Sequence, residues 1–176
     1  MASENELVLE TTERDYVLSR VLDAPREKVF RAWTAPDLLA KWWGPHDFTV
    51  PVCKIDLRPG GTFRVVMHSS EGKDYPLTGV YQEVIAPEMI VYTENWEEHP
   101  AEWQELLKKN LAPGGNLSSN EALVTVTFED QEGKTKLTVR MRFESPVVRD
   151  AFVKMGMEGG WNQSFDRLAS LLAAMP

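Results

Sequence analysis

Apolar and polar residues alternate with a period of two through most of the chain from residue 48 to residue 143. This is the pattern of antiparallel strands that have one face in solvent. Turn residues separate the alternating stretches, which are 48–52, 62–68, 77–85, 89–95, 122–128 and 135–143. An earlier run rich in β-branched and aromatic residues, 16–22, predicts one more strand. We therefore expect an antiparallel sheet of six to seven strands.

Three segments instead carry apolar residues at helical spacing. Start signals at Asp23-Ala24-Pro25 and at residues 34–37 predict two short helices directly after the first strand, and Gly44-Pro45 ends the second. After Ser145-Pro146 the helical spacing continues to Leu172, which predicts one long C-terminal helix. Its middle contains three glycines that each cost about 1 kcal/mol relative to alanine. Either a kink or close backbone approach, or space for a ligand beneath the helix, would explain Gly156, Gly159 and Gly160.

A carboxylate falls on the face of 77–85 that should be covered. Glu83 shares the alternation of Tyr81, and a buried carboxylate needs a partner. One explanation is a structural ion pair with Arg20, which follows the apolar alternation of 16–22. The other is that Glu83 and Tyr81 orient a ligand in an apolar pocket. In that case the pocket would also include Met67, Thr93 and Asn95.

The segment 96–120 interrupts the strand pattern. It predicts a helix over residues 100–111 with one apolar side, followed by a polar, glycine-containing loop. A helix with an apolar face beside a cavity is a candidate lid. A helix packed on the sheet edge and a contact between two subunits are the alternatives. Trp96 and Trp103 lie in this segment and could close over a ligand.

The adjacent tryptophans at the end of the second short helix cannot both be buried by one helix face. We expect one of them, Trp43, to border a cavity mouth together with His46 and Phe48. Trp33 and Trp161 follow apolar helix stripes and are expected in the core.

Composition and charge restrict the class of protein. The chain has 176 residues, 19 basic and 27 acidic, for a formal net charge of -8. That length predicts one domain, residues 1–176. The acidic balance with scattered basic residues disfavours nucleic-acid binding. Without a signal peptide, a long apolar run or a second cysteine beside Cys53, we expect a cytoplasmic protein that spans no membrane.

Residues that could carry catalysis or bind metal are few. His46, His68, His99 and Cys53 show no paired CxxC or HxxxH spacing, so we expect no metal and no cofactor. Gly60-Gly61 has no following helix and indicates a turn, not a phosphate loop. A GxSxG motif is absent from the sequence. We therefore assign no catalytic residue.

Four motifs, in order along the chain, carry a family resemblance: Val21 to Pro45, Asp56 to Arg64, Gly79 to Val84 and Gly159 to Leu168. Together they resemble the START-like family related to the activator of heat shock protein 90 ATPase, within the SRPBCC, or birch-pollen-allergen-like, superfamily. The resemblance covers roughly residues 14–174. It implies an α+β helix-grip fold, in which a curved antiparallel sheet wraps around the C-terminal helix and leaves a cavity between them.

The resemblance implies that the cavity holds a small hydrophobic or aromatic molecule, and we expect binding without catalysis. One alternative is a co-chaperone-like module that stimulates heat shock protein 90, although that co-chaperone carries a second domain. Another is a polyketide cyclase or dehydratase that uses Glu83 or His46 as acid or base. The closing helix lacks the histidine that relatives often place before Gly-Trp, which disfavours proton transfer. The candidate cavity residues are Trp43, His46, Phe48, Met67, Tyr81, Glu83, Thr93, Asn95, Trp96, Trp103, Met155 and Gly159.

Overall fold

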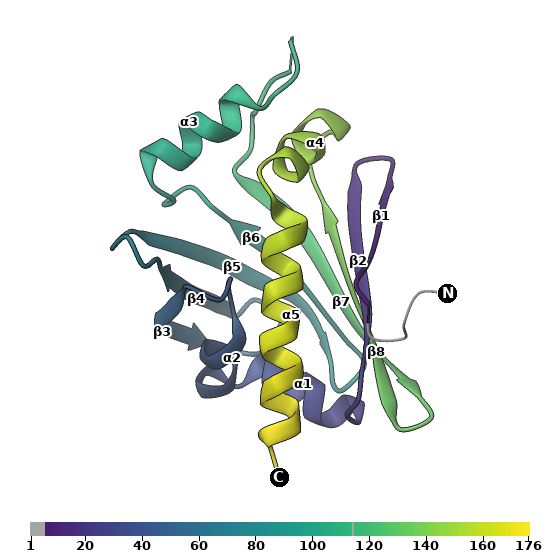
Figure 1. Cartoon of the computed structure of the whole chain (residues 1–176). Coiled ribbons are helices and arrows are strands. Elements are labelled where there is room, and N and C mark those ends of the chain that lie inside the picture. The colour runs from purple at the N-terminus through teal and green to yellow at the C-terminus, as the bar shows by residue number, and fades with distance from the viewer. Residues whose placement is uncertain (1–5, 114) are drawn as a thin grey trace.

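A computed structural model describes residues 6–113 and 115–176 (Figure 1). In this part of the chain, eight antiparallel strands form one sheet in the order β1-β2-β8-β7-β6-β5-β4-β3. The strands are β1 (Val8–Thr12), β2 (Asp15–Leu22), β3 (Thr49–Ile55), β4 (Thr62–His68), β5 (Asp74–Ile85), β6 (Met89–Asn95), β7 (Glu121–Gln131) and β8 (Lys134–Arg142). The helices are α1 (Arg26–Thr34), α2 (Pro36–Trp42), α3 (Ala101–Lys109), α4 (Pro146–Lys154) and α5 (Met157–Ala174).

The helix α5 crosses one face of the sheet, and α1 and α2 lie near its C-terminal end (Figure 1). Inward-facing residues alternate along β7 and β8, as the sequence predicts, and they are buried together with Phe165 and Leu168 of α5. The α+β helix-grip arrangement is therefore confirmed. No helix in the described part of the chain combines the length and hydropathy needed to cross a membrane.

The predicted number of six to seven strands is wrong by one. The additional strand is β1, which pairs with β2 so that Val8 lies opposite Ser19. It is an edge strand, and its residues are exposed except for the half-buried Leu9. An edge strand with both faces largely in solvent has no clear alternation, so the pattern did not reveal it.

The predicted single C-terminal helix is two helices. Ser145 caps α4, because its Oγ accepts a hydrogen bond from the amide of Val148 at 3.2 Å. At the junction, Gly156 adopts a φ of 87°, in the left-handed region that favours glycine. Gly159 and Gly160 continue as the first turn of α5. Of the three glycines, Gly156 makes the break, and α4 turns away from the axis of α5 (Figure 1).

The predicted burial of Glu83 is also wrong. A register shift between Tyr81 and Glu83 marks a β-bulge in β5, and Glu83 is exposed. A bulge inserts an extra residue and reverses the alternation that follows it. Arg20 does not pair with Glu83; its guanidinium lies 2.7 Å from Asp166 of α5.

One set of hydrogen bonds ties α5 to the connection between α2 and β3, and we call it the Arg167 anchor. The Arg167 guanidinium donates to the carbonyl oxygens of Gly44 and Pro45 at 2.9 and 3.0 Å, with further bonds to those of Lys41 and Trp43. The Ser164 hydroxyl accepts the amide N–H of Gly44 at 3.1 Å, and the Gln163 side chain accepts that of His46 at 3.0 Å. Two of the sequence motifs thus bind each other directly.

The break at Gly156 leads to the first prediction. Gly156→Ala should lower the free energy of unfolding by about 1–2 kcal/mol, because alanine is strained in the left-handed region. The matched control is Gly159→Ala, because the helix has room for a methyl group at this position. This variant should raise the free energy of unfolding by about 0.5 kcal/mol. Urea denaturation measures both. Equal stability of Gly156→Ala and the unmodified protein would contradict the assignment of the break to this residue.

Candidate functional site

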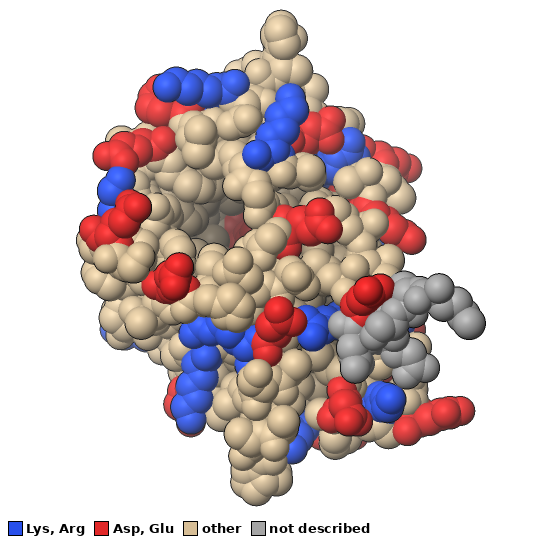
Figure 2. All heavy atoms as spheres, in the orientation of Figure 1, with Lys and Arg blue, Asp and Glu red and all other residues tan. Residues whose placement is uncertain are grey.

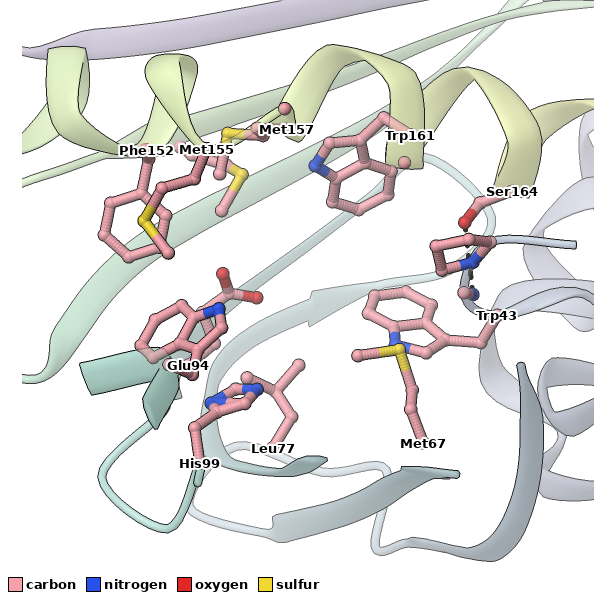
Figure 3. Close-up of a pocket in the computed structure, with 16 residues that line it drawn as sticks. Trp43, Met67, Leu77, Glu94, His99, Phe152, Met155, Met157, Trp161 and Ser164 are labelled. Carbon is pink, nitrogen blue, oxygen red and sulfur yellow. Dashed lines mark hydrogen bonds between the residues drawn. The ribbon is translucent and has the colours of Figure 1, made fainter. Parts of the chain in front are cut away.

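An apolar cavity of about 270 Å³ lies between the sheet and the helices α4 and α5. Figure 2 shows its mouth as a hollow with mostly uncharged walls and an acidic side chain at its depth. The floor comes from the sheet, through Met67 of β4, Leu77 of β5 and Met141 of β8. The roof comes from Phe152 of α4, which points toward that floor (Figure 3), and from Met157 of α5.

Aromatic rings make up much of the wall, and they are held by contacts with one another. The rings of Trp43 and Trp161 meet edge-to-face with centroids 5.5 Å apart. On the other side, Trp103 of α3 packs against Phe152 at 5.7 Å and stacks on His99 at 4.5 Å. The contact between Trp43 and Trp161 fixes the orientation of these two rings, so this side of the cavity wall is formed before any ligand arrives.

Glu94 is the carboxyl group of this cavity. It lies on β6 between two small residues, Gly79 of β5 and Ala122 of β7, and its side chain points toward the roof (Figure 3). It is 6% exposed, and among the described residues no hydrogen-bond donor or cation is paired with its carboxyl group. Burial away from water raises its pKa to about 8. Near neutral pH the group is therefore mostly protonated and available to a ligand.

His99, in the connection between β6 and α3, is the second titratable group of the lining. Its Nδ1 lies 3.2 Å from the carbonyl oxygen of Trp96, which can only accept, so the neutral ring donates there. Burial lowers the pKa of His99 to about 4. The ring is neutral at physiological pH and contributes an aromatic face, not a positive charge.

Four of the twelve predicted cavity residues line this cavity: Trp43, Met67, Trp103 and Met155. Two others lie behind its wall. Trp96 packs against Phe152 at 4.8 Å, and Tyr81 borders a separate small void beside Trp33. Neither is in the lining.

The remaining six predicted residues lie elsewhere. Thr93 and Asn95 face the opposite side of the sheet, because Ile90, Tyr92 and Glu94 take the inward positions of β6. The prediction for this strand was shifted by one residue, which moves every side chain to the other face.

Glu83 is exposed beyond the bulge, and Gly159 faces solvent on α5 next to the cavity-lining Gly160. His46 is exposed in a shallow surface depression beside Arg167. Phe48 is half-buried against Tyr75, with ring centroids 5.7 Å apart.

Glu94 is not among the cavity residues predicted from the sequence, although the sequence contains a signal for it. Ile90 and Tyr92 precede it at a spacing of two, and both are larger apolar or aromatic residues than Thr93 or Asn95. If the covered face of 89–95 is assigned to the alternation that contains Ile90 and Tyr92, Glu94 falls on that face.

The described residues contain no group of three His, Cys, Asp or Glu side chains that could hold a metal ion. Cys53 is half-buried on β3, and burial raises the pKa of its thiol to about 11. A thiol with that pKa is protonated at neutral pH, which disfavours a reactive thiolate.

A curved antiparallel sheet, a closing C-terminal helix and a cavity between them define a helix-grip protein of the START-like, or SRPBCC, class. The chain belongs to the family described as "Activator of Hsp90 ATPase homolog 1-like protein", whose model matches residues 23–173. No curated protein matches the chain significantly.

Several solved structures are similar. A protein from Rhodobacter sphaeroides is 24% identical with a TM-score of 0.80, over 97% of this chain and 100% of that one. A protein from Nitrosomonas europaea is 27% identical with a TM-score of 0.73, over 91% and 94%. The AHSA1 protein from Silicibacter pomeroyi is 25% identical with a TM-score of 0.67, over 91% and 98%. These likenesses support the helix-grip fold across nearly the whole chain.

The burial of Glu94 predicts how stability depends on pH. The pKa of a glutamate is ordinarily 4.5, and that of folded Glu94 is about 8. Between these values the unfolded chain releases the proton and the folded protein keeps it, so the free energy of unfolding falls as pH rises. Glutamine does not ionise, so Glu94→Gln removes this pH-dependent fall in the free energy of unfolding. The variant should match the unmodified protein near pH 4.5 and exceed its stability above pH 8 by at most roughly 5 kcal/mol.

Urea denaturation across this pH range measures the effect. Glu83→Gln is the control, because it changes an exposed carboxylate on the neighbouring strand and should leave the pH profile unaltered. Identical pH profiles for Glu94→Gln and the unmodified protein would show that Glu94 is hydrated and not buried.

Proposed function

We propose that the protein binds a small hydrophobic or aromatic molecule in the cavity beneath α4 and α5, without catalysing a reaction. The observation that carries this proposal is a mostly apolar, aromatic-walled cavity with one buried, unpartnered carboxyl group. Its volume of about 270 Å³ is near the lower end of ordinary ligand pockets, which span about 300–1,000 Å³. The expected ligand is therefore compact.

We further propose that residues 14–174 act as one ligand-binding domain in which 96–120 serves as a lid. This segment contributes His99 and Trp103 to the cavity wall. Exposed ion pairs connect it to β4 and to the turn between β4 and β5: Arg64 with Glu98 at 2.7 Å, and Lys73 with Glu102. Exposed pairs of this kind contribute only about 0–1 kcal/mol each, so these two contacts oppose opening of the segment only weakly.

Adjacent glycines on α5 provide a matched test of the cavity. Gly160 lines it with only Pro45 close by, whereas Gly159 faces open space. Gly160→Leu should fill the cavity and weaken binding of naphthylmethanol, a compact neutral aromatic probe, by at least about tenfold. Gly159→Leu should bind it as the unmodified protein does. Isothermal titration calorimetry measures both, and equal affinities in the two variants would place the probe outside this cavity.

The proposed lid predicts a change in amide hydrogen exchange. With naphthylmethanol bound, amides of 96–120 should exchange more slowly than in the free protein, because Trp103 and His99 gain contacts with the probe. Amides at the centre of β7 and β8 serve as the internal reference. Equal exchange of 96–120 in the two states would contradict a lid.

Native mass spectrometry of the protein purified from its source cells would detect a natural ligand that co-purifies with it. A co-purified small molecule that is absent from Gly160→Leu would support the proposal. Retention of heat shock protein 90 in a pull-down, with stimulation of its ATPase and no bound small molecule, would instead favour an interaction module.

A further inference from the structure

We propose that the ligand carries a single ammonium group, which forms an ion pair with the Glu94 carboxylate inside the cavity. This inference rests on the proposed binding function and names the chemical class of the ligand: a compact aromatic or hydrophobic body bearing one organic cation. It follows from the position of Glu94, from the character of the surrounding walls and from the charges that the lining lacks.

The Glu94 side chain is 6% exposed, and the surface that it keeps faces the cavity. A carboxyl group that loses water without gaining a hydrogen bond costs free energy, and proteins ordinarily supply a donor from a neighbouring element. Here the two flanking strand positions hold Gly79 and Ala122, which have no donor side chain. The carboxyl points into the open cavity (Figure 3), so the missing donor would come from the ligand.

The walls around Glu94 suit a positive charge. The faces of aromatic rings attract cations, most strongly those of tryptophan, and the energy grows when the cation is desolvated. Methionine thioethers add polarizable contacts. Such groups approach the cavity from several elements, and they are Trp43, Trp103, Trp161, Phe152, Met67 and Met155.

Among the described residues, no lysine or arginine is paired with Glu94. The lining contains neither lysine nor arginine, and the nearby Arg167 is occupied by the backbone carbonyls of its anchor. The titratable groups around Glu94 are Tyr92 on its own strand and His99 before α3, and both are uncharged at neutral pH. The residues that α4, α5, β4, β5 and β8 present to the cavity are uncharged. A net charge of -8 also favours the approach of cations.

Binding of an ammonium ligand to Glu94 should release a proton, whereas binding of an uncharged ligand should not. Near pH 6.5 the free protein holds Glu94 as the acid, and the ligand arrives as the ammonium ion. The complex contains carboxylate and ammonium, so the Glu94 proton is released to solvent as the ligand binds. About one proton should be released at pH 6.5 and much less than one at pH 8.5, where Glu94 is already mostly ionised.

Three probes with the same ring system separate the alternatives: naphthylmethylamine, naphthylmethanol and naphthoate. At pH 8.5 the amine should bind at least about tenfold more tightly than the alcohol, and naphthoate should not bind. Between pH 6.5 and 8.5 the affinity for the amine should rise by more than about tenfold while that for the alcohol stays constant. Calorimetry in two buffers of different ionisation enthalpy counts the protons released.

Two variants provide the controls. Glu94→Gln should lose the preference for the amine and the proton release but still bind the alcohol, which shows that the cavity is intact. Glu83→Gln removes an exposed charge on the adjacent strand and should behave as the unmodified protein does.

The outcomes distinguish this inference from the proposed function. If the alcohol binds as tightly as the amine at both pH values, or if naphthoate binds best, the ammonium inference is wrong and the binding function stands. If neither the amine nor the alcohol binds and no small molecule co-purifies, both proposals are wrong. Binding of the amine without proton release, unchanged in Glu94→Gln, would place the cation away from Glu94.

Discussion

The hydrogen bonds of Arg167 hold the two halves of the cavity in place. The connection between α2 and β3 contains a run of backbone carbonyl oxygens that helix and sheet hydrogen bonds leave without donors. The guanidinium of Arg167, on α5, donates hydrogen bonds to them. Burial lowers the pKa of Arg167 from its usual value, yet a guanidinium with that starting value stays charged at neutral pH. With Ser164 and Gln163 it fixes where α5 crosses the sheet and where Trp43 faces Trp161.

The cavity is the space that remains where the helical layer and the sheet separate. Near the anchor, Phe165 and Leu168 of α5 pack against the sheet, and both are fully buried. Above it, Gly156 breaks the helix and Gly160 contributes no side chain, so the roof is thin at that level. Glu94 lies beneath this roof on the sheet. The thin roof leaves the cavity open above Glu94, and the surrounding helices limit its contact with bulk water.

Much of the fold could be predicted from the sequence because one face of the sheet is solvated. The strands β7 and β8 alternate cleanly, and the start signals of α1 and α4 stand directly before those helices. The site was harder to predict. A bulge after Tyr81 reverses the phase of β5, and on β6 the polar Thr93 and Asn95 were assigned to the covered face in place of Glu94. His99 and Phe152 come from segments whose positions over the sheet depend on tertiary packing, which periodicity does not report.

We propose Glu94 as a desolvated carboxyl group whose partner is a ligand. The most direct measurement is the pH titration of its side-chain carboxyl carbon by ¹³C NMR, with Glu94→Gln used to assign the signal. In the free protein the titration should give a pKa of about 8, and saturation with naphthylmethylamine should lower it toward the ordinary value of 4.5. A free-protein pKa near 4.5, unchanged when the amine is added, would contradict the account.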